Sequence, residues 1–194
     1  ITVPLVLSLP EAIKTNSFAG FAALFGFFFM FLSNKVVKTY TKKRELAFGI
    51  TAAEGIGIHS FVDGLIYTIT FQSSILMGFL AGTGLVIHEF AEGAITYIFL
   101  TKGGIKKELA GIYAFFVAGL TTPLGAFIVY PFVSNLERSL LGLLLGFVSG
   151  VLLYVAASHL LPKARDEESG HEHSIIAFIA GVGLALFIVL TKIF

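Results

Sequence analysis

Long hydrophobic runs separated by short polar stretches dominate this chain. A helix needs roughly 20 apolar residues to cross a bilayer, and six of the runs are long enough. The pattern predicts membrane-spanning helices over about 17–37, 45–70, 74–101, 108–131, 139–162 and 174–193. Residues 1–16 hold only a short apolar piece, which fits the end of a further helix or an interfacial segment.

The predicted fold class is all-α: a polytopic transmembrane helical bundle of six spans plus the end of another. Residues 1–194 are expected to form a single transmembrane domain. Proline lacks the backbone N–H that an α-helix requires. Pro123 and Pro131 should therefore kink or end the fourth predicted span, and Pro162 should end the fifth.

The composition agrees with a location in the lipid bilayer. The chain is 56% hydrophobic and 13% charged, about half the charge of a typical soluble domain, and its mean hydropathy is +0.92. A net charge of +1 gives no indication of a nucleic-acid partner. Because the chain has no cysteine, disulfides and thiolate metal ligands are excluded.

The basic residues are concentrated in alternate connections. Ten of the 13 lysines and arginines lie in the loops 35–44, 102–107 and 163–173. Positive loops stay on the cytoplasmic side of a membrane, which predicts these loops inside and the carboxyl terminus outside. We expect the membrane to be the plasma membrane. The loop 163–173 also carries His171 and His173, and is either a solvated acidic linker or a tract that collects metal ions.

Two segments with the same polar pattern interrupt the second and third predicted spans. They are His59-Ser-Phe-Val-Asp63-Gly64 and His88-Glu89-Phe-Ala-Glu92-Gly93. Positions four apart share a helix face, so each segment stacks a histidine over a carboxylate. Two such helices packed together would offer two imidazoles and two carboxylates to one point, as zinc, iron(II) or manganese would require. The glycine after each motif permits close helix packing.

Two further carboxylates lie near these motifs. Glu89 is about 60° around the helix from Glu92, and could act as an extra ligand or accept the second ring N–H of a histidine. Glu54 is about 140° from His59. It is either a second station for the ion or a proton, or the partner of a neighbouring helix.

Other functions fit the motifs less well. Buried polar pairs that only hold helices together would not require the same pattern on two helices, and ionisable groups at membrane depth are usually functional. The segment His88-Glu89-Phe-Ala-Glu92 is similar to the zinc-protease pattern H-E-x-x-H, but Glu92 stands where that chemistry needs a histidine. We therefore predict a transporter rather than an enzyme. The alternatives are a metal-sensing or scaffold membrane protein and an intramembrane metallohydrolase.

At this point the motifs resemble a known family. The paired segments are similar to the fourth- and fifth-helix motifs of the ZIP (Zrt/Irt-like protein) family of divalent-metal transporters. The segment 119–126, Gly-Leu-Thr-Thr-Pro-Leu-Gly-Ala, resembles the family's sixth-helix Gly-x-x-Glu-Pro-Leu-Gly, and 158–162 resembles the end of its seventh helix. The resemblance implies that the six spans are helices three to eight. The first helix and most of the second would then be absent here.

The resemblance also implies a site. Its metal ligands would be His59, Asp63, His88 and Glu92, with Glu89 nearby. Ser60 and Thr122 stand where the family usually has asparagine and glutamate, so we expect one metal ion at the centre rather than two. His159 stands where a carboxylate is usual, and is either an exit-path ligand or a buried hydrogen-bonded histidine.

The predicted function is transport of divalent transition-metal ions, most simply zinc, into the cytoplasm. Iron(II), manganese, cobalt and cadmium also suit the ligands, and no resident cofactor is expected. As the resemblance implies, spans two to four would move as an elevator-like block. No ATP-binding motif is present. Because histidine must be neutral to bind metal, uptake should fall at acid pH. A homodimer is compatible with the sequence, which leaves the oligomeric state open.

Overall fold

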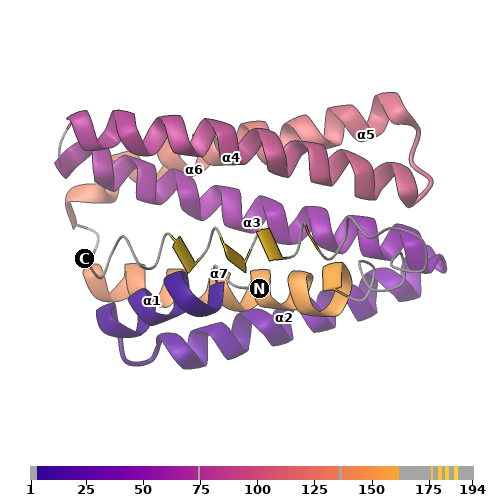
Figure 1. The fold of residues 1–194 in the computed structure, drawn as a ribbon, viewed down its shortest axis with the longest axis horizontal. Coiled ribbons are helices and arrows are strands. Elements are labelled where there is room, and N and C mark those ends of the chain that lie inside the picture. Colours follow the sequence, from indigo (N-terminus) through magenta and orange to yellow (C-terminus); the bar gives the residue numbers. More distant parts are fainter. Residues whose placement is uncertain are drawn as a thin grey trace. The chain divides into compact units, whose positions relative to one another are not determined.

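In the computed structural model, the described residues are 4–73, 75–135 and 137–161, with the short pieces 176, 179–180, 182–183 and 186–187. Every described element is helical, which confirms the all-α fold class (Figure 1). The predicted loop 163–173, with His171 and His173, lies outside the described residues, as does Pro162. Most of the last predicted span, 174–193, lies outside them too.

The chain divides into two compact units. One comprises residues 1–27 and 138–194, and the other comprises residues 28–137. Helix α2, Ala19–Thr41, belongs to both, because the boundary between the units falls after Phe27.

The first unit is built around α7, Arg138–Val155, which continues as a π-helical turn over Ala156–Leu160. A π-helical turn over Pro4–Ser8 leads into α1, Leu9–Thr15, and both pack against α7. The early part of α2 also packs closely on α7. A methyl group added at Gly150 would overlap the backbone carbonyl of Ala23, so these two helices are in backbone contact.

The second unit contains α3, Arg44–Ser73, and α4, Ile75–Lys102, followed by α5, Lys107–Ala114, and α6, Thr121–Val129. Helix α3 packs against both α4 and α6 (Figure 1). The contact between α3 and α6 is close because each helix places a glycine against the backbone of the other helix. A methyl group at Gly64 would overlap the carbonyl oxygen of Thr122, and one at Gly125 would overlap that of Phe61.

The fourth predicted span is continuous but irregular, as its prolines predict. Helix α5 passes into a π-helical segment, Phe115–Leu120, immediately before α6. The wide π turn accommodates Pro123, which cannot donate to the carbonyl four residues earlier. Helix α6 ends at Val129, and Pro131 lies in the 3₁₀ turn Tyr130–Asn135 that follows.

The loop predicted over 35–44 is wrong, because most of this segment is helical. Helix α2 continues to Thr41 and α3 begins at Arg44, so the connection is only two residues long, with Lys42 at φ 54°. The segment contains no glycine or proline that would end the helix earlier. The hydroxyls of Thr39 and Thr41 also donate to backbone carbonyls one turn before them.

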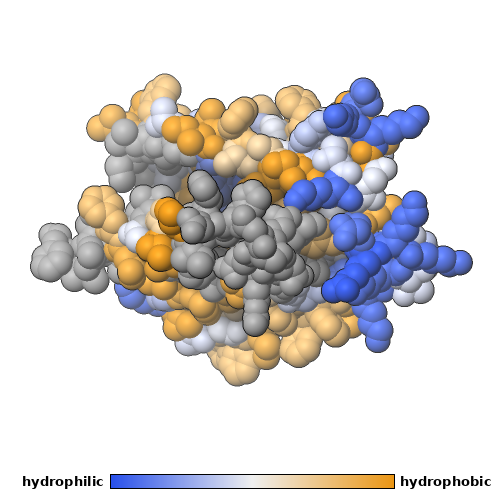
Figure 2. All heavy atoms as spheres, turned by 45° about the vertical axis from the view of Figure 1, so that its right-hand side comes forward, coloured by the Kyte–Doolittle hydropathy of each residue, from blue (hydrophilic) through white to orange (hydrophobic). Residues whose placement is uncertain are grey.

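The basic residues of the second unit nevertheless gather at one end of it. Helices α2 and α4 end there, and helices α3 and α5 begin there (Figure 1). The lysines and arginine of 35–44 and 102–107 are all exposed, and Figure 2 shows hydrophilic side chains gathered together. The two basic connections therefore share an end of this unit, as the charge pattern predicts.

Three helical stretches among the described residues are long and apolar enough to cross a membrane: Ala19–Thr41, Lys107–Phe132 and Arg138–Ser158. They correspond to the first, fourth and fifth predicted spans. Helices α3 and α4, with 30 and 28 residues, are also longer than a bilayer requires. They carry both of the histidine–carboxylate motifs.

Candidate metal centre

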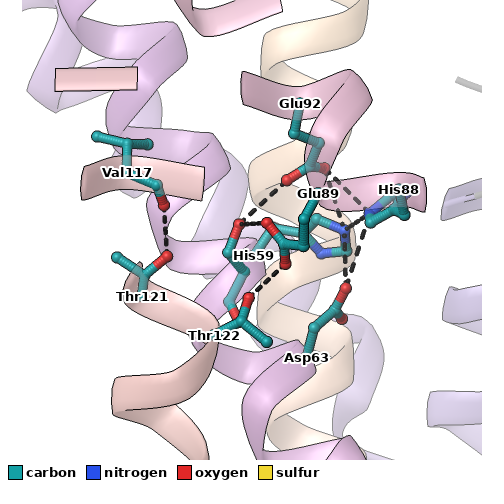
Figure 3. Close-up of polar contacts among 9 residues, drawn as sticks. His59, Asp63, His88, Glu89, Glu92, Val117, Thr121 and Thr122 are labelled. Carbon is teal, nitrogen blue, oxygen red and sulfur yellow. Dashed lines mark hydrogen bonds and ion pairs between the residues drawn. The ribbon is translucent and has the colours of Figure 1, made fainter. Parts of the chain in front are cut away.

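The two motifs meet where α3 packs against α4. In each helix, the histidine and the carboxylate four residues later lie on one face, and these two faces oppose each other (Figure 3). The Nε2 atoms of His59 and His88 are 2.9 Å apart. The structure therefore brings the two imidazoles together, as the helical spacing predicts.

Two carboxylate oxygens complete the cluster. Asp63 Oδ2 lies 3.4 Å from His59 Nε2 and 3.7 Å from His88 Nε2. Glu92 Oε1 lies 3.4 Å and 3.1 Å from the same two nitrogens. Ligands bound tetrahedrally to zinc at about 2.0–2.1 Å are separated from one another by about 3.3 Å. The observed distances between these atoms, 2.9 to 3.7 Å, bracket that value.

His59, Asp63 and His88 form a group that could hold a metal ion, with one potential ligand atom each, all within 4.8 Å of one another. Glu92 joins them through its contacts with both imidazoles. The side chains of His59, Asp63 and Glu92 are between 11% and 15% exposed, whereas that of His88 is 46% exposed. His88 is therefore the least enclosed member of the cluster.

The other ring nitrogen of His59 has an unusual environment. Its Nδ1 atom is buried and has no hydrogen-bond partner among the described residues. Metal-binding histidines generally donate this second N–H to a carboxylate, a carbonyl or water. Glu89, which could have been that acceptor, instead contacts two hydroxyl groups.

Those hydroxyls belong to Ser60 and Thr122. Ser60 Oγ lies 3.1 Å from Glu89 Oε2 and 3.1 Å from Glu92 Oε2. Thr122 donates from α6 to Glu89 Oε1, and its Oγ1 is also 3.0 Å from the backbone oxygen of Ser60 (Figure 3). The sequence indicated Ser60 and Thr122 as weak replacements for ligands. In the structure they are hydrogen-bond donors to the carboxylates.

Glu54 and His159 are the two further candidate residues. Glu54 accepts a 2.5 Å hydrogen bond from Ser33 of α2, which agrees with its interpretation as the partner of a neighbouring helix. Ser33 belongs to no motif that would have indicated this contact, although it is one of few polar residues at the end of an apolar run. His159 lies in the π-helical turn Ala156–Leu160, and its side chain is outside the described part of the structure.

The two motif glycines differ from each other. Gly64 faces the backbone of α6, as expected for a close helix contact. Gly93 does not make such a contact, because a methyl group there would lie 3.6 Å from the Cβ of Ala118, an ordinary van der Waals distance. The repeated glycine therefore has a packing role in α3 that it lacks in α4.

Long apolar helices and a cluster of two imidazoles and two carboxylates define this chain as an integral membrane protein with a potential divalent-metal site. Comparison with known proteins makes the class more specific. Residues 42–190 match the ZIP zinc transporter family. The chain belongs to this family, as its motifs predict.

Three curated relatives, all named zinc transporter ZupT, illustrate the similarity. The chain is 36% identical to the protein of Clostridium perfringens over 162 residues, which are 80% of this chain and 56% of the relative. It is 37% identical to that of Chlorobium chlorochromatii over 142 residues, 73% of this chain and 52% of the relative. It is 44% identical to that of Chlorobium limicola over 144 residues, 70% of this chain and 51% of the relative.

The chain thus spans about half the length of these relatives. No solved structure matches it.

Proposed function

We propose that this protein transports divalent transition-metal ions across a membrane, and that zinc is its principal substrate. The observation that carries the proposal is the convergence of two imidazole nitrogens and two carboxylate oxygens from adjacent helices. The similarity to proteins named zinc transporters supports the choice of metal. Two nitrogens and two oxygens also suit zinc better than an oxygen-only site would.

The charges of the cluster suit a desolvated dication. A buried ion is costly unless it is paired, and here the charges of Asp63 and Glu92 would balance those of one M²⁺ ion. The two neutral imidazoles would add ligands without adding charge. Transport requires this balance, because the ion must leave water, stay bound at membrane depth and then leave the site again.

Residues 28–137 form a compact unit that contains the complete cluster. This supports alternating access in which α3, α4 and α6 move as one block and carry the ion with them. We further propose that the basic connections 42–43 and 102–107 face the cytoplasm of the cell, as their charge favours, and that the ion is delivered to that side. A transporter of this family would not be an enzyme.

The test is zinc flux into liposomes that contain the full-length protein. Removing both imidazoles, in the variant His59→Ala, His88→Ala, should abolish saturable zinc uptake. The matched control is Phe90→Ala, because Phe90 lies on α4 between His88 and Glu92 but is 82% exposed. Uptake should be retained in that variant. Undiminished flux in the double histidine variant would refute the assigned site. Zinc binding without any flux in the wild type would instead indicate a metal sensor.

A further inference from the structure

The carboxylate of Glu89 is held on both of its oxygens by hydroxyl groups from two other helices. Ser60 of α3 lies at Oε2, and Thr122 of α6 donates to Oε1 (Figure 3). Glu89 is next to His88 in sequence, yet its oxygens are turned toward these hydroxyls. The carboxylate oxygens that lie against the two imidazoles are those of Asp63 and Glu92 instead.

Thr122 is well suited to hold Glu89 in place. Its hydroxyl also lies 3.0 Å from the backbone oxygen of Ser60. The single hydroxyl proton is therefore shared between an acceptor on α3 and the Glu89 carboxylate on α4. The facing glycines Gly64 and Gly125 set the distance between α3 and α6 at this level. A side chain on α6 therefore determines where a carboxylate on α4 can lie.

The position of Glu89 affects which metal the cluster prefers. With Glu89 held away, the potential ligands are two imidazole nitrogens and two carboxylate oxygens, a set that suits zinc. If Glu89 turned toward the ion, a third carboxylate would make the site richer in oxygen and more negative. Such a site suits harder ions, of which manganese is the transition-metal example.

We propose that Thr122 is a positioning residue that sets the metal preference of the centre, by keeping the Glu89 carboxylate out of the ligand set. This inference rests on the proposed function, since it concerns the same site. It identifies α6, which contributes no ligand to the cluster, as the element that determines the selectivity for zinc over manganese.

The test measures the dissociation constants of zinc and manganese for the purified full chain, by competition with a chromophoric chelator. The quantity of interest is the ratio of the two constants, because a loss of folded protein or of general affinity cancels in it. Thr122→Val removes the hydroxyl at similar volume, and should shift the ratio about tenfold toward manganese. Thr122→Ser retains a hydroxyl and should keep the wild-type ratio. Thr122→Ala removes the hydroxyl by a second route, in case the valine variant does not fold.

A double variant tests whether the effect passes through Glu89. Glu89→Gln removes the charge that would harden the site, so Thr122→Val in that background should leave the ratio of Glu89→Gln unchanged. A persistent shift in the double variant would overturn the proposal, and so would an unchanged ratio in both Thr122→Val and Thr122→Ala. If the wild-type protein bound neither metal, the proposed function would fail as well. Wild-type binding with an unchanged ratio would overturn only the role of Thr122.

Discussion

The contact between α3 and α6 provides the sharpest test of how packing supports the metal centre. Gly64 follows Asp63 directly and lies against the α6 backbone at Thr122 and Ala126. A methyl group at this position would overlap the carbonyl oxygen of Thr122 and lie 2.7 Å from the backbone nitrogen of Ala126. Neither obstacle is a side chain that can rotate away. Gly64→Ala must therefore push the two helices apart.

The structure gives the size of this effect. Ordinary contacts begin at 3.4 Å, so the helices must separate by more than half an ångström at Ala126 and by more at Thr122. Overpacking a well-packed interior costs about 1–3 kcal/mol, while replacing glycine by alanine within a helix recovers up to about 1 kcal/mol. Because both obstacles are backbone atoms, the upper half of the overpacking range applies. The net loss of about 1–2 kcal/mol would lower the melting temperature by about 2–8 °C for a chain of this size.

The second motif supplies a matched control. Gly93 occupies the same place after Glu92 as Gly64 does after Asp63, but among the described residues a methyl group there meets only the Cβ of Ala118, at 3.6 Å. Gly93→Ala should therefore be neutral or stabilising. Thermal unfolding of both variants in detergent, with and without zinc, measures the difference. Zinc affinity should fall about tenfold in Gly64→Ala, since the displaced backbone also carries Asp63, the ligand that precedes Gly64.

Equal melting temperatures for the two variants would refute this reasoning, as would a larger loss for Gly93→Ala. Normal stability with reduced zinc affinity in Gly64→Ala would show that α6 moves without cost, which contradicts the close packing described here.

Two further predictions concern other helix contacts. Ser33→Ala leaves the Glu54 carboxylate without its hydroxyl donor, and should reduce the free energy of unfolding by about 1–3 kcal/mol in chemical denaturation. Zinc affinity, measured by metal titration, should not change. An altered zinc affinity would instead place Glu54 in the transport path. Gly150→Ala should lower the melting temperature because its methyl group would overlap the Ala23 carbonyl. Gly20→Ala should not, since no atom of the described residues outside its own helix lies within 4 Å of a methyl group there.

Much of this architecture could be predicted from the sequence. Hydrophobic runs located the described helices, because a long apolar segment in a bilayer must satisfy its backbone internally and has little choice except helix. The spacing of four residues between His59 and Asp63, and between His88 and Glu92, correctly placed each pair on one helix face. The convergence of the two pairs was predicted as well, since consecutive helices joined by a short connection pack antiparallel.

The extent of the connections and the roles of the remaining polar residues were harder to predict. Helix α2 continues through 35–41 because lysine and threonine form helices readily when nothing interrupts them, although their charge suggested a loop. The repeated motif also predicted the same role, close helix packing, for Gly64 and Gly93. Only the position of α6 distinguishes them, and that position depends on contacts between residues some 60 positions apart.

The same long-range contact explains why Glu89 was the most ambiguous residue in the sequence. Helical periodicity gives the direction of a side chain from its own axis, but it does not show which neighbouring helix supplies its partner. Glu89 was therefore compatible both with an extra ligand and with an acceptor for the second N–H of a histidine. Its hydrogen bonds to Ser60 and Thr122 follow from the glycine contact that brings α6 against α3. Two residues with almost no side chain of their own, Gly64 and Gly125, thus set the position from which Thr122 reaches Glu89.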